Sequence, residues 1–172
     1  MFGFGKRKKH LQQFETLVTS VFGTYMIMRS LSQHRFEETK LEPMALQAFE
    51  GCYILGGIDA LAHGIDLNEE SIKQDDIIQM FVETCSGYEI FTAEESRGVV
   101  SLVILLIADG NAAHELMYLG AKDATDCSAA MMAGEDSSVA AKAMSPDYLD
   151  DKELIKKFKT LMKDFMTTQN LK

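Results

Sequence analysis

Apolar residues near the start of the chain recur at alternating spacings of three and four. The stripe is made of Leu11, Phe14, Val18, Val21, Tyr25 and Met28. An α-helix has about 3.6 residues per turn, so this spacing brings all six residues to one helix face. No stretch of convincing length alternates apolar and polar residues as a strand would. The chain is therefore predicted to be all-α.

Composition favours helices gathered into a single domain. The 172 residues are enough to enclose one sizeable core. There are only two prolines, whereas Ala, Leu and Met, which favour helices, are common. We expect one domain over residues 1–172, a bundle of about six to eight helices, with residues 1–8 as a flexible basic tail. The expected helices span about 8–30, 43–63, 68–87, 92–109 and 111–120, followed by short helices within 121–145 and a last helix from Ser145.

Local signals predict where two helices begin and which segment is buried. Pro43 suits a first helical turn, because its missing N–H has no partner to lose there, and the polar stretch 32–42 before it is expected to be a linker. Thr92 and Glu95 have the spacing of a capping box. The apolar run 99–108 is about half the length needed to span a bilayer, so it is predicted to be a helix buried on all sides.

Glycines and cysteines within the predicted helices are interpreted as structural. Gly51, Gly56 and Gly57 lack any surrounding phosphate-loop pattern, so we expect them to permit close helix approach or a bend. The three cysteines are far apart and odd in number, which predicts buried, reduced thiols. The basic segment 6–9 is followed by polar residues and not by the apolar core of a secretory signal. These features predict a cytoplasmic protein.

Charge is unevenly distributed along the chain. Residues 1–36 carry six bases and one acid, residues 37–151 carry five bases and 23 acids, and residues 152–172 carry six bases and two acids. The acidic middle disfavours nucleic-acid binding, since phosphate contacts need clustered Lys and Arg. The basic ends could pack on the middle, grip an acidic partner or be solvated helix faces. Phe2, Phe4 and the adjacent bases could touch an anionic membrane surface, or they could form a solvated tail.

A short pattern occurs twice, in which an apolar stretch reaches a glycine turn and restarts on a glutamate. The first copy runs over 62–69 and the second over 108–115. In the first, His63, Asp66 and Glu69 lie around the turn, and in the second, Asp109, His114 and Glu115 do so. Oxygen ligands suit Mg²⁺ or Ca²⁺, and imidazoles add Mn²⁺ or Zn²⁺. The same residues also fit ordinary helix caps and first-turn acids, so both interpretations stay open.

The second copy resembles a known family. Residues 107–117 read Ile-Ala-Asp-Gly-Asn-Ala-Ala-His-Glu-Leu-Met, which is similar to the helix–Ala-Asp-Gly–helix signature of TerB-like proteins. That family is named for a tellurite-resistance protein and is similar to the N-terminal domain of some membrane-tethered co-chaperones. The resemblance implies an all-helical bacterial domain, linked to stress response, with divalent-metal binding through Asp109 and Glu115. In the first copy His63 stands where Asp is expected, although Gly64 and Glu69 fit.

These features favour a non-enzymatic helical domain that binds a protein partner, with a divalent cation at the helix joints. The alternatives are a metal-dependent enzyme and an acidic inhibitor or immunity-type protein. An enzyme would need both joints to converge on one pocket. A binding module would present an exposed groove lined by methionine or aromatic side chains, although methionines also fill gaps in helical cores. The candidate groove methionines are Met26, Met28, Met131, Met132, Met144, Met162 and Met166.

Overall fold

The computed structural model describes residues 3–65 and 72–169, and all regular structure within these ranges is helical. The elements are α1 (Gly3–Leu31), α2 (Gln33–Glu38), α3 (Pro43–Ile65), α4 (Gln74–Gly87), α5 (Ala93–Asp109), α6 (Asn111–Met132), α7 (Ser137–Ala143), a 3₁₀ turn η1 (Asp147–Asp150) and α8 (Lys152–Thr168). The all-α prediction is confirmed, and the number of α-helices falls within the expected range. No single helix among the described residues has the length and apolar character to cross a bilayer; α5 and α6 meet that criterion only as a sharply bent pair.

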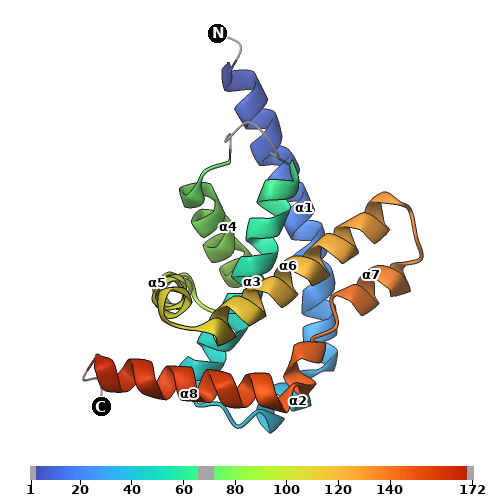
Figure 1. Cartoon of the computed structure of the whole chain (residues 1–172). Helices are drawn as coiled ribbons and strands as arrows, with labels where there is room; N and C mark the ends of the chain where they lie inside the picture. The colour runs from blue at the N-terminus through green and yellow to red at the C-terminus, as the bar shows by residue number, and fades with distance from the viewer. Residues whose placement is uncertain (1–2, 66–71, 170–172) are drawn as a thin grey trace.

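Helix α3 is the centre of the fold. Figure 1 shows α1, α4, α6 and α8 arranged around it. From Ala48 to Ile58 every residue of α3 is buried, including the ionisable Glu50. The helix buried on all sides is therefore α3 and not the segment 99–108. The apolar run of α5 buries one face only, because Ile104 is 42% exposed and Leu105 is 50% exposed.

Glycines allow α3 and α6 to cross with their backbones in contact. A Cβ atom added to Gly120 would overlap the carbonyl oxygen of Tyr53, and one added to Gly56 would overlap that of Met117. A Cβ atom at Gly57 would lie 3.1 Å from the carbonyl oxygen of Gly120. Moving either helix away to make room would open the packed core around it, so side chains are excluded here. The expectation of close approach at the α3 glycines is confirmed, while Gly120 lies inside α6 and does not end it.

Other predicted boundaries need correction. Gly64 was expected to cap a helix ending at His63, but α3 continues through it to Ile65. The expected linker 32–42 contains α2, whose Phe36 is buried. The predicted start of the third helix near Asn68 lies outside the described residues, which show α4 beginning at Gln74.

The helices at the two ends of the chain also differ from the prediction. Helix α1 begins at Gly3, so the segment expected to be a flexible tail is helical from that residue onward. Arg7 in this segment donates two hydrogen bonds, of 3.0 and 2.9 Å, to the carboxylate of Asp76. At the other end, the last helix does not open at Ser145, because η1 intervenes and the Asp151 side chain caps α8.

Two predicted helix starts are confirmed. Pro43 is the first residue of α3. Thr92 caps α5 by accepting a hydrogen bond from the backbone N–H of Glu95, whose side chain in turn accepts one from the Thr92 N–H. Both signals are local, so the sequence alone was sufficient to find them.

We expect Gly120→Ala to destabilise the protein strongly, because the new methyl group would collide with the α3 backbone. The free energy of unfolding measured by urea denaturation should fall by about 3 kcal/mol or more, the upper end of the cost of overpacking. Gly64→Ala is the matched control, since an added Cβ meets no atom within 4 Å there. That substitution should be neutral or stabilise by up to about 1 kcal/mol. A tolerated Gly120→Ala would contradict the close crossing.

Candidate functional site

The first predicted joint is only partly within the described residues. Asp66 and Glu69 lie in 66–71, outside them. His63 lies in the last turn of α3, where its side chain is 73% exposed. Its Nδ1 atom is 2.8 Å from the backbone oxygen of Asp59 and 3.6 Å from a carboxylate oxygen of the same residue. His63 is thus held by its own helix.

The second joint is a tight turn between α5 and α6. Gly110 connects the two helices in an extended conformation, and Asp109 is the last residue of α5. His114 is exposed in the first turns of α6. Next to it, Glu115 accepts a hydrogen bond of 3.2 Å from the ammonium of Lys157 on α8. Glu115 already has a cationic partner in this structure.

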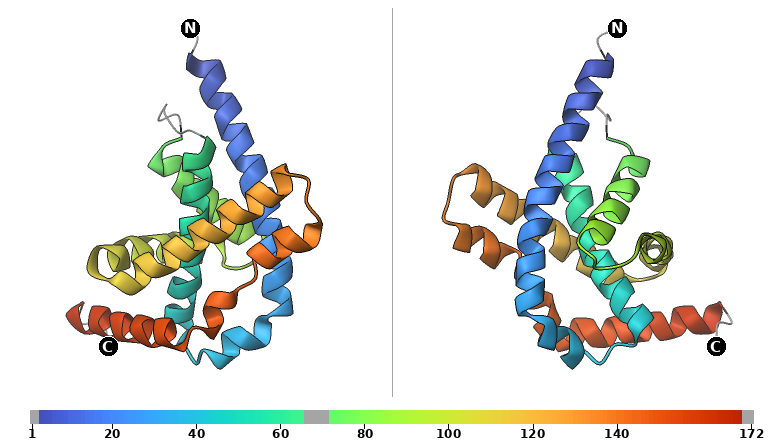
Figure 2. Two further views of the ribbon diagram at one scale, coloured as in Figure 1. Left: turned by 45° about the vertical axis from the view of Figure 1, so that its right-hand side comes forward. Right: turned by 180° about the vertical axis from the view of Figure 1, so that it is seen from behind.

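The described part of the first joint lies away from the second joint. In both Figure 1 and Figure 2 the C-terminal end of α3 and the turn between α5 and α6 lie in different parts of the molecule. Within 3–65 and 72–169, no group of three or more His, Cys, Asp and Glu side chains is placed to hold a metal ion. The shared pocket that a metal-dependent enzyme would need is therefore not formed by these residues. Metal binding at either joint stays a prediction.

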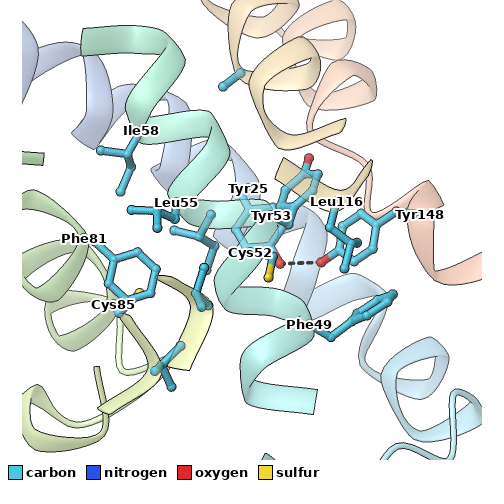
Figure 3. Close-up of a cluster of buried hydrophobic side chains, with 14 of the residues drawn as sticks. Tyr25, Phe49, Cys52, Tyr53, Leu55, Ile58, Phe81, Cys85, Leu116 and Tyr148 are labelled. Atoms are coloured by element: carbon cyan, nitrogen blue, oxygen red, sulfur yellow. Dashed lines mark hydrogen bonds between the residues drawn. The ribbon is translucent and has the colours of Figure 1, made fainter. Parts of the chain in front are cut away.

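A buried polar network lies next to α3 instead, and the sequence analysis missed it. The Tyr25 hydroxyl donates a hydrogen bond of 2.8 Å to Glu50 Oε1, and Arg29 donates two, of 2.5 and 3.0 Å, to the same carboxylate. The Tyr148 hydroxyl lies 2.9 Å from that of Tyr25, a contact drawn as the dashed line in Figure 3. The rings of Tyr53 and Tyr148 stack with centroids 4.3 Å apart. The network ties α1, α3 and η1 together.

Burial and charge shift the ionisation of this network in a consistent direction. Burial, followed by the nearby Glu50 carboxylate, raises the pKa of Tyr25 and Tyr148 well above 10. Burial likewise raises the pKa of Tyr53, and the Asp123 carboxylate adds to the effect. Burial tends to lower the pKa of Arg29, but the hydrogen bonds and charge of Glu50 outweigh it and raise that pKa. The phenols are thus neutral, and Arg29 and Glu50 form a charged pair.

The network is closed to ligands except at Arg29, whose side chain is 28% exposed. Glu50 is 1% exposed, Tyr25 is fully buried and Tyr148 is 5% exposed. Every polar atom named above already has a partner within the chain. A buried charge pair of this kind gives little net stability, but removal of one partner leaves an uncompensated charge and costs roughly 3–5 kcal/mol. We therefore interpret the network as structural.

The thiols are also structural, as predicted. Cys52, Cys85 and Cys127 are buried and free. Burial raises the pKa of Cys52 to about 12 and that of Cys127 to about 11, and it raises the pKa of Cys85 as well. At neutral pH these side chains are protonated thiols, and the thiolate is the nucleophilic form.

A cleft of about 580 Å³ lies between α6, α7 and η1, and four aspartates line it. Asp123 accepts a hydrogen bond of 3.0 Å from Tyr53, and burial raises the pKa of Asp123 despite that bond. The other three are engaged as well, Asp126 with Lys122, Asp147 with Arg35, and Asp151 with the N-terminus of α8. Contacts within the chain therefore account for every carboxylate in the cleft.

A second concave surface has a different character. It is a groove of about 440 Å³ between the start of α3 and α8, and we call it the Met–Lys groove. It is lined by Lys40, Leu41, Glu42, Met44, Ala45, Lys159, Met162, Lys163 and Met166. Figures 1 and 2 show the start of α3 beside α8. Methionine, leucine and alanine side chains form its apolar part, and three exposed lysines border it.

Sequence reasoning found part of this groove. Met162 and Met166 were among the candidate groove methionines, and the basic character of residues 152–172 was noted. Met44 and Lys40 were not singled out, because they precede or open α3, more than 100 positions from α8 in the sequence. Met131 and Met132 line a separate shallow groove beside α1, and Met144 is buried in the core.

Comparison with known proteins gives no further assignment. No family model matches the chain, and neither a curated protein nor a solved structure does. The resemblance to TerB-like proteins remains a prediction.

The buried phenols predict a steep loss of stability in alkali. An unfolded tyrosine loses its proton near pH 10, whereas folding holds Tyr25, Tyr53 and Tyr148 protonated well above that pH. The stability that these groups contribute is present below about pH 10 and is lost as the pH rises further. In a tyrosinate absorbance titration, these three of the five tyrosines should ionise together with the loss of circular dichroism. Ionisation of all five in a chain that stays folded would contradict the burial.

Proposed function

We propose that this protein is a non-enzymatic helical interaction domain, and that its Met–Lys groove binds an acidic amphipathic helix of a partner protein. The observation that carries the proposal is the pairing of an apolar floor with a basic rim at one concave surface. An amphipathic helix buries an apolar stripe in such a groove while its polar edges face the rim. The partner's stripe should repeat at spacings of three and four, with Asp or Glu beside it.

The floor of the groove suits an interaction surface. Met162 is 5% exposed and joins the core, whereas Met44 is 42% exposed at the mouth and Met166 lies between these extremes. Methionine is unbranched and polarisable, so it adapts to differently shaped apolar side chains. A groove with an accessible methionine at its mouth supports the proposal of a binding module.

The rim supplies the charge selectivity. Lys40, Lys159 and Lys163 are exposed, and no ion pair within the described residues engages any of them. Glu42 is the acidic residue among the groove's lining. The whole chain carries a net charge of −9, so this local positive rim is opposite in sign to the molecule as a whole. An acidic partner is therefore favoured at the groove over the acidic surface formed by the middle of the chain.

A synthetic peptide tests the groove directly. The probe is an amphipathic helix of about 20 residues, long enough for several turns, with Leu on one face and Glu on the other. It should bind the protein in a fluorescence anisotropy titration, and added salt should weaken it. Lys159→Glu/Lys163→Glu should weaken binding by at least about tenfold, because attraction becomes repulsion at the rim.

Lys152→Glu/Lys156→Glu is the matched control, because both lysines lie on α8 outside the groove. It changes the net charge by the same amount and should weaken binding much less. A peptide of the same composition with its Leu and Glu positions scrambled should not bind. Equal effects of the two double variants would show a non-specific charge interaction and would overturn the proposed groove.

A divalent cation at the joint between α5 and α6, with a link to stress response, is a separate part of the proposal that rests on the TerB-like resemblance. Calorimetric titration with Mg²⁺, Ca²⁺, Mn²⁺ and Zn²⁺ tests it. Saturable binding that Asp109→Ala/Glu115→Ala removes would support a site there. The absence of binding would leave Glu115 as the ion-pair partner of Lys157.

A further inference from the structure

The outward face of α5 carries no charge over most of its length. Its inward residues, Val99, Val100, Val103 and Leu106, are buried against the core. Within residues 98–108 the exposed residues are Gly98, Ser101, Ile104, Leu105 and Ala108, and none of them is ionisable. An exposed helix face normally carries charged or strongly polar residues. We call this set of exposed residues the uncharged strip.

We propose that a second copy of this chain covers the strip, with two α5 helices packed antiparallel about a two-fold axis. Gly98, Ser101, Leu105 and Ala108 are spaced by three, four and three residues, so their spacing reads the same in both directions. A two-fold axis beside position 103 therefore brings every one of them opposite another member of the set. Self-complementarity of this kind is what an isologous dimer interface requires.

Side-chain size fits the same arrangement. With the axis beside position 103, Leu105 of each copy lies opposite the small Ser101 of the other, and Ala108 lies opposite Gly98. An added Cβ at Gly98 would meet no atom of its own chain within 4 Å, so space exists there for the second helix. Large residues facing small ones allow two helices to approach closely.

Arg97 supports a second copy in this orientation. Two chains that each carry a net charge of −9 repel one another, but residues 98–108 bring no ionisable side chain to the contact. Antiparallel packing brings the N-terminal end of each α5, which carries the exposed Arg97 together with Glu94 and Glu95, to the C-terminal end of the other α5. Backbone carbonyls make that end partially negative, so the guanidinium and the helix end attract.

The oligomeric state provides the first test. Sedimentation equilibrium of the full chain should show a dimer, and Leu105→Glu should weaken dimerisation at least about tenfold by placing a charge at the centre of the strip. Leu105 is half-exposed, so the variant should keep its circular dichroism and melting temperature at low concentration. Ile27→Glu is the control, because Ile27 is 64% exposed on α1 and lies outside the strip. A monomer at all concentrations, or equal effects of both variants, would overturn the proposal.

Cysteine cross-linking tests the orientation. The native thiols are buried, so an exposed cysteine introduced on α5 should react selectively. A mixture of Gly98→Cys and Ala108→Cys should form a mixed disulfide in higher yield than either variant forms with itself. Preferential Gly98→Cys homodimers would indicate parallel packing and overturn the two-fold arrangement. Binding of a monomeric chain to neutral phosphatidylcholine vesicles, lost in Leu105→Glu, would instead assign the strip to a membrane surface and would also overturn it.

Discussion

The backbone contact between α3 and α6 fixes much of the remaining structure. At Gly56 and Gly120 no side chain separates the two helices, so their crossing point is set by atoms that cannot repack. Helix α6 continues beyond this point to Met132, and α7 packs back against that extension. Since α7 leads into η1 and α8, the crossing also determines where the C-terminal third of the chain returns to the bundle.

A second constraint comes from placing Glu50 inside the core. A buried carboxylate needs hydrogen-bond donors for its oxygens, and Arg29 and Tyr25, both from α1, donate to Glu50. Figure 3 shows the aromatic residues of this arrangement. Tyr148 of η1 joins them indirectly, through the contact of its hydroxyl with that of Tyr25, so the network around one acidic side chain on α3 connects elements from both ends of the chain. The polar network therefore contributes specificity of arrangement more than net stability.

The two surfaces that we propose to bind partners result from these packing constraints. The return of α8 beneath the start of α3 forms the Met–Lys groove, and the placement of α5 at the margin of the bundle leaves its outer face uncovered. The groove is basic and apolar, whereas the α5 strip is uncharged, so the two surfaces suit different occupants. This separation is compatible with a domain that pairs with itself through one surface and engages an acidic helix through another.

Local patterns in the sequence determined the helical class, the capping box at Thr92 and the start of α3 at Pro43, because each depends on periodicity or on residues a few positions apart. The buried thiols followed from the number and wide spacing of the cysteines. The tertiary structure alone decided which helix is central, why Gly120 does not end α6, and which residues meet at a site. The network of Tyr25, Arg29, Glu50 and Tyr148 joins residues far apart in the sequence. Tyr25 and Tyr148, for example, are 123 positions apart. Such contacts depend on how helices cross, and the crossing is fixed by shape at a few glycines that local spacing does not reveal.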